Sequence, residues 1–256
     1  MQIAHHHGRC VGVDGCRAGW LAVAAEPEPE GAEPRDGPLW IAVFPCLKDL
    51  LGVWGPLLAP GPSLAVDMVL GLPDSKRLVR PCDQAARQIL GRGATSRVFS
   101  PPSRAALEVF RRGGTYAEAL AVNRAAVGQG FSKQAWFLLP KIDELDALWG
   151  MSPVARQHVV EAHPEVAFAS LADGFGLHPP KKTRAGRQIR WETLSTHRPR
   201  LADLARRAWR QRPLPGTGED DFLDALALLW RLLDGQLQPV SPPQRDVRGR
   251  PMAIWA

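Results

Sequence analysis

The chain has 256 residues, of which 45% are hydrophobic, so it can bury a sizeable core, which argues against an intrinsically disordered chain. Its 32 Lys and Arg residues exceed its 26 Asp and Glu residues, giving a formal net charge of +6. This basic excess is compatible with a polyanionic partner.

Strands are predicted in the first part of the chain. An apolar run ending at Asp14, a glycine turn and a second apolar run from Trp20 predict a β-hairpin over 10–14 and 20–25. A third strand over 39–44 and a short helix over 47–54 come after a loop rich in Pro, Glu and Gly. The run from Leu64 to Asp67 predicts a short buried strand that again ends in a carboxylate.

From Asp83 the pattern becomes helical, with acid in the first turn and Gly91 at the end of the first helix. The later expected elements are helices over 103–112, 115–127 and 141–149, a strand over 157–162, a helix over 164–171, one or two helices within 181–212, and a helix over 220–233. This order predicts an α/β fold, a mixed sheet flanked by helices. We expect one domain over 1–256, in which 74–150 forms a helical insertion or cap.

The four cysteines contain no CxxC pair, which excludes the common zinc spacings and indicates buried free thiols in a reducing compartment. The N-terminal residues have no hydrophobic signal core, and no apolar run approaches transmembrane length. We therefore expect a cytoplasmic protein with no membrane partner. The sequence carries no signal for an oligomeric state.

Basic residues concentrate in two segments, 76–112 and 181–212, in a chain whose remainder is acidic. The simplest explanation is two solvated helical faces. Two local excesses nevertheless favour a phosphate-binding surface.

Carboxylates recur where predicted strands end and inside the last predicted helix. Asp14 ends the first strand, Asp67 ends the fourth, and Glu161 lies in the fifth. Asp221 and Asp224 are three residues apart, so they share one helix face. Because that helix is apolar on nearly all sides, its acids would be costly to bury without a cation or a donor.

Each acid also has an ordinary structural explanation. Asp14 could form the turn before Gly15, and Asp67 could cap or turn the chain. Asp221 could favour the helix dipole from the first turn. Asp224 fits that explanation poorly, because it lies a full turn further into the helix among leucines.

Together these acids predict a metal centre. Mg²⁺ and similar hard cations take oxygen ligands, and two ions about 3.5–4 Å apart can promote phosphodiester cleavage. We expect Asp14 to bridge such ions, with Asp67, Asp221 and Asp224 as further ligands and Glu161 as an additional candidate.

Seven ordered motifs resemble the domain-of-unknown-function 429 family, described as predicted nucleases with an RNase H-like fold. The motifs are Val11–Trp20, Asp67–Pro73, Cys82–Arg87, Ser96–Phe99, Lys141–Asp146, Glu161–Glu165 and Asp220–Ala225. The resemblance implies an RNase H-like mixed sheet with an antiparallel second strand, and acids on the first strand, the fourth strand and the last helix. The Asp-x-x-Asp spacing is also similar to that of Holliday-junction resolvases. Val69 departs from the family pattern, in which proline is more frequent.

The predicted substrate-binding residues surround these motifs. Arg17 lies in the first motif, and Arg87 and Arg97 are candidate bidentate phosphate contacts, as is Arg104. Lys141 belongs to a charged helix face, where the family match implies a substrate contact. His163 could shuttle protons, bind a metal or be a satisfied core histidine.

The sequence therefore predicts a nuclease that uses Mg²⁺ or Mn²⁺ to hydrolyse phosphodiester bonds in DNA or RNA. Asp14, Asp67, Glu161, Asp221 and Asp224 are the predicted catalytic residues. Two alternatives are a non-catalytic nucleic-acid-binding protein of the same fold, and an enzyme acting on a small phosphorylated ligand. The second alternative predicts a closed small pocket.

Overall fold

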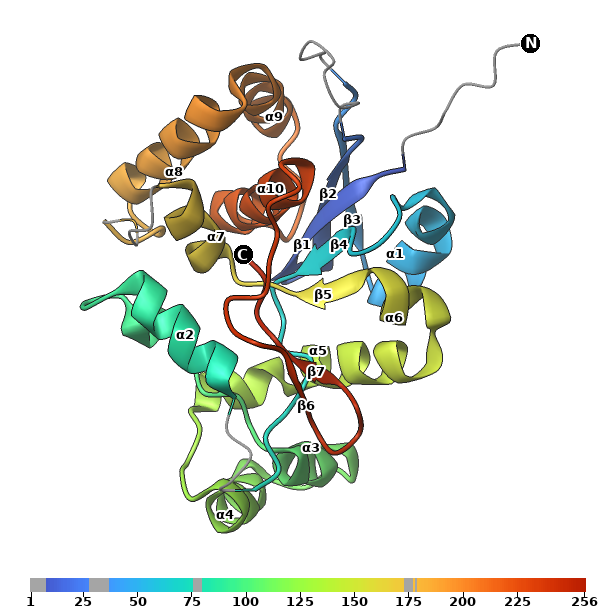
Figure 1. Cartoon of the computed structure of the whole chain (residues 1–256), viewed down its shortest axis with the longest axis vertical. Coiled ribbons are helices and arrows are strands. Elements are labelled where there is room, and N and C mark those ends of the chain that lie inside the picture. Colours follow the sequence, from blue (N-terminus) through green and yellow to red (C-terminus); the bar gives the residue numbers. More distant parts are fainter. Residues whose placement is uncertain (1–7, 28–36, 76–79, 173–176, 178) are drawn as a thin grey trace.

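A five-stranded mixed sheet lies at the centre of the computed structural model (Figure 1). The structure describes residues 8–27, 37–75, 80–172, 177 and 179–256. The strands are β1 (Cys10–Cys16), β2 (Gly19–Ala25), β3 (Trp40–Phe44), β4 (Leu64–Val66) and β5 (Val159–Glu161), in the order β3-β2-β1-β4-β5. β2 pairs antiparallel with both β1 and β3, whereas β1, β4 and β5 run parallel. The predicted α/β class is confirmed.

The predicted hairpin is confirmed, but its first strand is two residues longer than expected. β1 continues past Asp14, which pairs with Leu21, to Cys16, which pairs with Gly19. Gly19 has a φ of +128°, and a Cβ there would lie 2.2 Å from the Phe44 carbonyl oxygen. A glycine is therefore required where the hairpin passes the end of β3.

Helices cover both faces of the sheet (Figure 1). One face packs against α7 (Pro164–Leu171), α8 (Arg184–His197), α9 (Pro199–Gln211) and α10 (Glu219–Leu233), and the other against α1 (Leu47–Trp54) and α5 (Lys133–Met151). α10 lies directly on β1, where a Cβ at Gly12 would come within 2.0 Å of the Ala225 carbonyl oxygen. This close approach explains why α10 is apolar nearly all round.

The segment between β4 and β5 is helical, as predicted. It contains α2 (Pro81–Leu90), a 3-10 turn η2 (Thr95–Arg97), α3 (Arg104–Arg111), α4 (Tyr116–Val127), α5 and α6 (Pro153–His158). The α3 and α4 helices share a small core of their own, whereas α5 packs its apolar face on the sheet.

Three predicted boundaries were wrong. The helix expected over 141–149 begins at Lys133, where Ser132 caps it by accepting from the Ala135 amide at 3.1 Å, and it contains Pro140. The helix expected from Asp83 begins at Pro81, since proline suits a first helical turn. The strand expected over 157–162 is only three residues long, because 157–158 complete α6.

The last residues return to the sheet. After α10 the chain forms a small hairpin of β6 (Gln244–Arg245) and β7 (Pro251–Met252), which the sequence did not predict. The Trp255 amide then donates to the Glu161 carbonyl oxygen at 2.9 Å.

A short 3-10 turn, η1 (Gly55–Leu57), follows α1. In the described part of the chain, no helix has both the length and the apolar character that crossing a bilayer requires.

Candidate functional site

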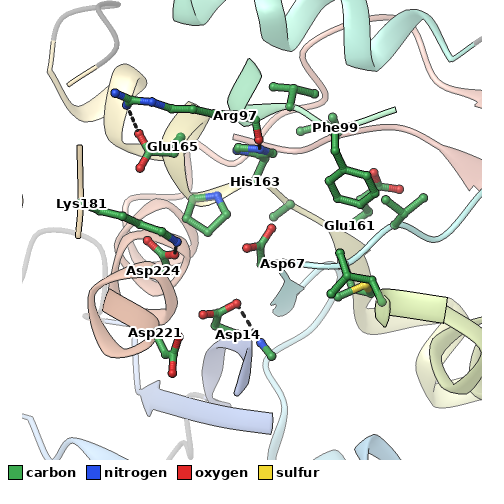
Figure 2. Close-up of a pocket in the computed structure, with 18 of the residues that line it drawn as sticks. Asp14, Asp67, Arg97, Phe99, Glu161, His163, Glu165, Lys181, Asp221 and Asp224 are labelled. Carbon is green, nitrogen blue, oxygen red and sulfur yellow. Dashed lines mark hydrogen bonds and ion pairs between the residues drawn. The ribbon is translucent and has the colours of Figure 1, made fainter. Parts of the chain in front are cut away.

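Asp14 and Asp67 lie together at the carboxyl edge of the parallel strands. Pairing between β1 and β4 ends at Val13 and Val66, and the Asp67 amide then donates to the Val13 carbonyl oxygen at 2.9 Å. The two acids are therefore the next residues on neighbouring strands. In open α/β sheets, ligands bind in the crevice outside this edge. Figure 2 shows both carboxylates facing the cavity.

The α10 helix brings two more acids to the same edge, because it packs on β1 at Gly12. Asp224 lies one turn into the helix, is only 1% exposed and faces Asp14 and Asp67 (Figure 2). Asp221 is half-buried, and one of its oxygens accepts from the Gly218 amide at 2.8 Å. Asp221 thus combines the helix-capping role with a place on the cavity wall.

The acids line a cavity of about 480 Å³. Its opposite wall is apolar, with Val69, Phe99, Leu138 and Ile254. Positive charge surrounds the acids: Arg97, Lys141, Lys181 and Lys182 also line the cavity. The volume lies within the range of small-molecule sites, and the walls combine apolar, acidic and basic side chains.

Burial and mutual repulsion make the three inner carboxylates unusually basic. Burial raises the pKa of Asp14 well above its ordinary value, and the nearby Asp67 and Asp224 carboxylates raise it further. Burial also raises the pKa of Asp67, although His163 and Lys181 oppose the change. Burial raises the pKa of Asp224 to about 7 despite the neighbouring Lys181. A cation placed among these groups would therefore be bound favourably, because it would stabilise their ionised forms.

Lys181 already supplies one positive charge. Its ammonium donates to Asp224 Oδ2, whereas Asp224 Oδ1 is buried without a hydrogen-bond partner in the described part of the chain. Lys141 approaches from α5, where its ammonium donates to the Gly19 carbonyl oxygen and lies 4.2 Å from the centre of the Trp20 ring. Burial lowers the pKa of Lys141, although nearby acids oppose the change.

Glu161 reaches the cavity wall with both oxygens already bonded. One accepts from the Leu70 amide at 2.9 Å, and the other accepts from the Arg80 guanidinium, which also pairs with Asp83 at 3.0 Å. Burial raises the pKa of Glu161 to about 7, with Arg80 opposing the change. This bonding makes Glu161 the anchor of a buried ion-pair network, and binding a metal would require it to release Arg80.

His163 lies beside Asp67 with one free ring nitrogen. Its Nε2 donates to the Arg97 carbonyl oxygen at 3.2 Å, so in the neutral ring Nδ1 is the unprotonated nitrogen. Nδ1 is buried and has no hydrogen-bond partner among the residues that the structure describes. The Arg97 guanidinium pairs instead with Glu165, which also accepts from Arg190 at 2.6 Å. Arg97 thus lines the cavity, but its guanidinium is already paired with Glu165.

Three other predicted phosphate contacts do not line the cavity. Arg87 donates to the Val98 carbonyl oxygen at 3.0 Å and to Ser100 Oγ at 3.1 Å. Arg104 is buried, paired with acids of α5 and of the C-terminal hairpin. Arg17 is exposed in the β1–β2 turn. Arg87 and Arg104 therefore form hydrogen bonds and ion pairs within the fold.

Sequence reasoning missed the side chains that complete the cavity. Lys181 was counted only within the basic segment 181–212, and Phe99 only within a family motif. Arg80, the partner of Glu161, also lies in a basic segment. No local pattern distinguishes Lys181 and Arg80 from solvated charges, because their partners Asp224 and Glu161 are distant in the sequence.

The metal prediction depends on ligand chemistry, and the described conformation contains no preformed centre. Among the described residues, no three His, Cys, Asp or Glu side chains are arranged to hold a metal ion. The donor type nevertheless fits Mg²⁺ or Mn²⁺, which prefer carboxylate oxygens. The buried, unpartnered Asp224 Oδ1 is an observation that such an ion would explain.

The fold and site define an α/β protein with a buried acidic site at the carboxyl edge of its sheet. The chain belongs to the family described as "Protein of unknown function (DUF429)", whose model matches residues 12–244. The resemblance found in the sequence motifs is thereby confirmed at the level of the family. No curated protein and no solved structure matches the chain.

Proposed function

We propose that this protein is a nuclease of RNase H-like fold that uses Mg²⁺ or Mn²⁺ to hydrolyse phosphodiester bonds in DNA or RNA. The observation that carries the proposal is the meeting of Asp14, Asp67 and Asp224 at one cavity, from three separate elements. The strand order β3-β2-β1-β4-β5 and the antiparallel β2 support the RNase H-like assignment. The antiparallel β2 agrees with what the motif resemblance implied.

The metal would be held by Asp14 and Asp67, with Asp224 Oδ1 and the free oxygen of Asp221 as further donors. When bound, such an ion activates water and stabilises the charge that develops on a phosphoryl group. The protein's own part is to hold these carboxylates ionised and close together. Their raised pKa values show that this closeness costs free energy without a cation, and a bound cation would recover it.

Other cavity residues fit the remaining requirements of a nucleic-acid substrate. Lys141 and Lys182 place positive charge at the cavity wall, where a phosphate would bind. His163 Nδ1 is a buried acceptor able to hold a proton beside Asp67. The Phe99 ring offers an apolar surface for a base.

An exposed aromatic side chain lies next to the cavity on α5. Gln134, Leu138 and Lys141 of this helix line the cavity, and Phe137, one turn before Lys141, is 74% exposed. An aromatic ring with this exposure is accessible to a ligand that extends beyond the cavity. It would stack on an unpaired base outside the cavity.

A second candidate function is favoured by the size of the cavity. A volume of about 480 Å³ would also accept a small phosphorylated ligand. This enzyme would use the same acids but would leave polymers intact.

The test is a cleavage panel in Mg²⁺ and Mn²⁺ with single-stranded, duplex, hybrid and branched DNA and RNA, together with bis(p-nitrophenyl) phosphate and p-nitrophenyl phosphate. We compare wild type with Asp14→Asn, and use Asp203→Asn as a matched control, since Asp203 is exposed on α9 and pairs only with its helix neighbour Arg207 among the described residues. Cleavage of a polymer that is lost only in Asp14→Asn supports the nuclease. Turnover of the monoester alone supports the second candidate.

A further inference from the structure

One cavity lysine, Lys181, is ion-paired with one of the inner acids. Lys181 precedes α8, and its ammonium donates to Asp224 Oδ2 (Figure 2). The lysine side chain is 32% exposed and that of Asp224 only 1%, so the ammonium reaches inward from the surface to a buried carboxylate. Removing the lysine from such a pair would leave a buried carboxylate without its counter-charge, which is costly.

Two other long cations of the cavity wall, Lys141 and Arg97, are bonded elsewhere. Lys141 donates to a backbone carbonyl oxygen of the β1–β2 hairpin, and the Arg97 guanidinium pairs with Glu165. Lys181 is thus the described cavity cation that pairs directly with one of the inner acids.

The ion pair with Lys181 bonds only one of the two carboxylate oxygens of Asp224. Its Oδ1 is buried with no hydrogen-bond partner among the described residues, although its Oδ2 binds Lys181. A buried, unpaired carboxylate oxygen is costly, and a bound cation would satisfy it. Asp224 lines the same cavity as Asp14 and Asp67 (Figure 2).

We propose that Lys181 takes the place of a second divalent ion in this centre, so that the chain binds one Mg²⁺ or Mn²⁺ and the ammonium provides the other positive charge. The inference rests on the proposed metal-dependent function. Two-metal sites share acidic ligands between ions about 3.5–4 Å apart. Here Asp14 and Asp67 hold the ion, and Asp224 joins it to the ammonium. Lys181 is a positioning residue that fixes Asp224 and limits the number of ions.

The count of bound ions tests this role without depending on activity. Metal-free wild type, Lys181→Met and Lys181→Arg are titrated with Mn²⁺ and followed by electron paramagnetic resonance and calorimetry. We expect one Mn²⁺ per chain for wild type and Lys181→Arg, and two for Lys181→Met, where Asp224 is released. Lys48→Met is the control, because Lys48 is an exposed lysine of α1, and it should bind one ion.

Two results would overturn the assignment. Wild type binding two ions would do so without any variant, and so would one ion of unchanged affinity in Lys181→Met. Because Lys181→Met leaves buried acids unpaired, thermal unfolding is measured alongside the titration. We expect Mn²⁺ to raise the Tm of this variant more than that of wild type, and an equal shift would count against the proposal. If Lys181→Met does not fold, Lys181→Gln replaces it.

The cleavage panel run on the same samples separates the two proposals. One ion in wild type and two in Lys181→Met, with no cleavage of any substrate, would support the role of Lys181 and refute the nuclease. Cleavage by a wild type that holds two ions would refute only the role of Lys181. If neither wild type nor any of the variants binds Mn²⁺, the metal-dependent nuclease and the role of Lys181 are both refuted.

Discussion

The pH dependence of stability should report on Asp224 directly. In the folded protein burial raises its pKa from the ordinary value of 3.8 to about 7, although Lys181 opposes the change. Because the folded pKa is the higher one, the folded state binds more protons than the unfolded state between these values, and stability falls as pH rises. Each pH unit corresponds to about 1.4 kcal/mol, so the ionised carboxylate costs about 4 kcal/mol above pH 7.

The Asp224→Asn variant removes this titration and keeps the shape of the side chain. We expect its free energy of unfolding to fall less steeply than that of wild type between pH 4 and 7, by as much as about 1.4 kcal/mol per pH unit. Urea denaturation in EDTA at half-unit pH intervals measures both slopes. Saturating Mn²⁺ should flatten the wild-type curve, since a bound cation stabilises the ionised acids.

The Asp220→Asn variant is the control, because Asp220 lies in the first turn of the same helix but does not line the cavity. It should follow the wild-type curve. Parallel curves for wild type and Asp224→Asn would show that Asp224 titrates normally in the folded protein, and the reasoning about the buried acids would then be wrong.

Three further changes test the fold and the substrate surface. Arg80→Met leaves the buried Glu161 unpaired and should destabilise the protein by about 3–5 kcal/mol in urea denaturation. Gly12→Ala places a Cβ 2.0 Å from the Ala225 carbonyl oxygen and should cost at least about 1–3 kcal/mol, seen as a lower Tm. Phe137→Ala should weaken binding of single-stranded oligonucleotides by about 1–3 kcal/mol in fluorescence anisotropy, with an unchanged Tm.

Each of these has a matched comparison. Adding Glu161→Gln to Arg80→Met should restore part of the stability, and failure to do so would count against the ion-pair explanation. Gly52→Ala has no atom within 4 Å of the new Cβ and should not lower the Tm. Met151→Ala removes another exposed apolar side chain from α5, and equal loss of binding in this variant would exclude a specific role for Phe137.

The hairpin and the strand-end acids could be predicted because short local patterns determine them. Apolar runs interrupted by Asp14 and Gly15 indicate a turn, and the Asp-x-x-Asp spacing places Asp221 and Asp224 on one helix face. Their convergence depends on Gly12, whose lack of a side chain lets α10 lie against β1. A glycine inside a strand pattern indicates such a close approach without naming the partner.

The roles of the basic residues could not be predicted in the same way. Arg80, Arg104 and Lys181 look alike in the sequence, yet the first two are buried in ion pairs and the third meets Asp224 at the cavity. Their respective partners Glu161, Asp146 and Asp224 lie 42 or more residues away, so only the fold decides which acid each charge meets. The first half of α5 could not be predicted either, because Pro140 lies inside the helix and proline normally ends a helix pattern.

The most direct test of the acidic centre is cleavage of the nucleic-acid panel by metal-free protein, supplied with Mn²⁺ or with EDTA, for wild type and Asp14→Asn. We expect wild type to cut at least one substrate only with the metal, and Asp14→Asn to bind that substrate without cutting it. Binding by wild type with no cleavage of any substrate in Mg²⁺ or Mn²⁺, or equal cleavage by Asp14→Asn, would contradict the account.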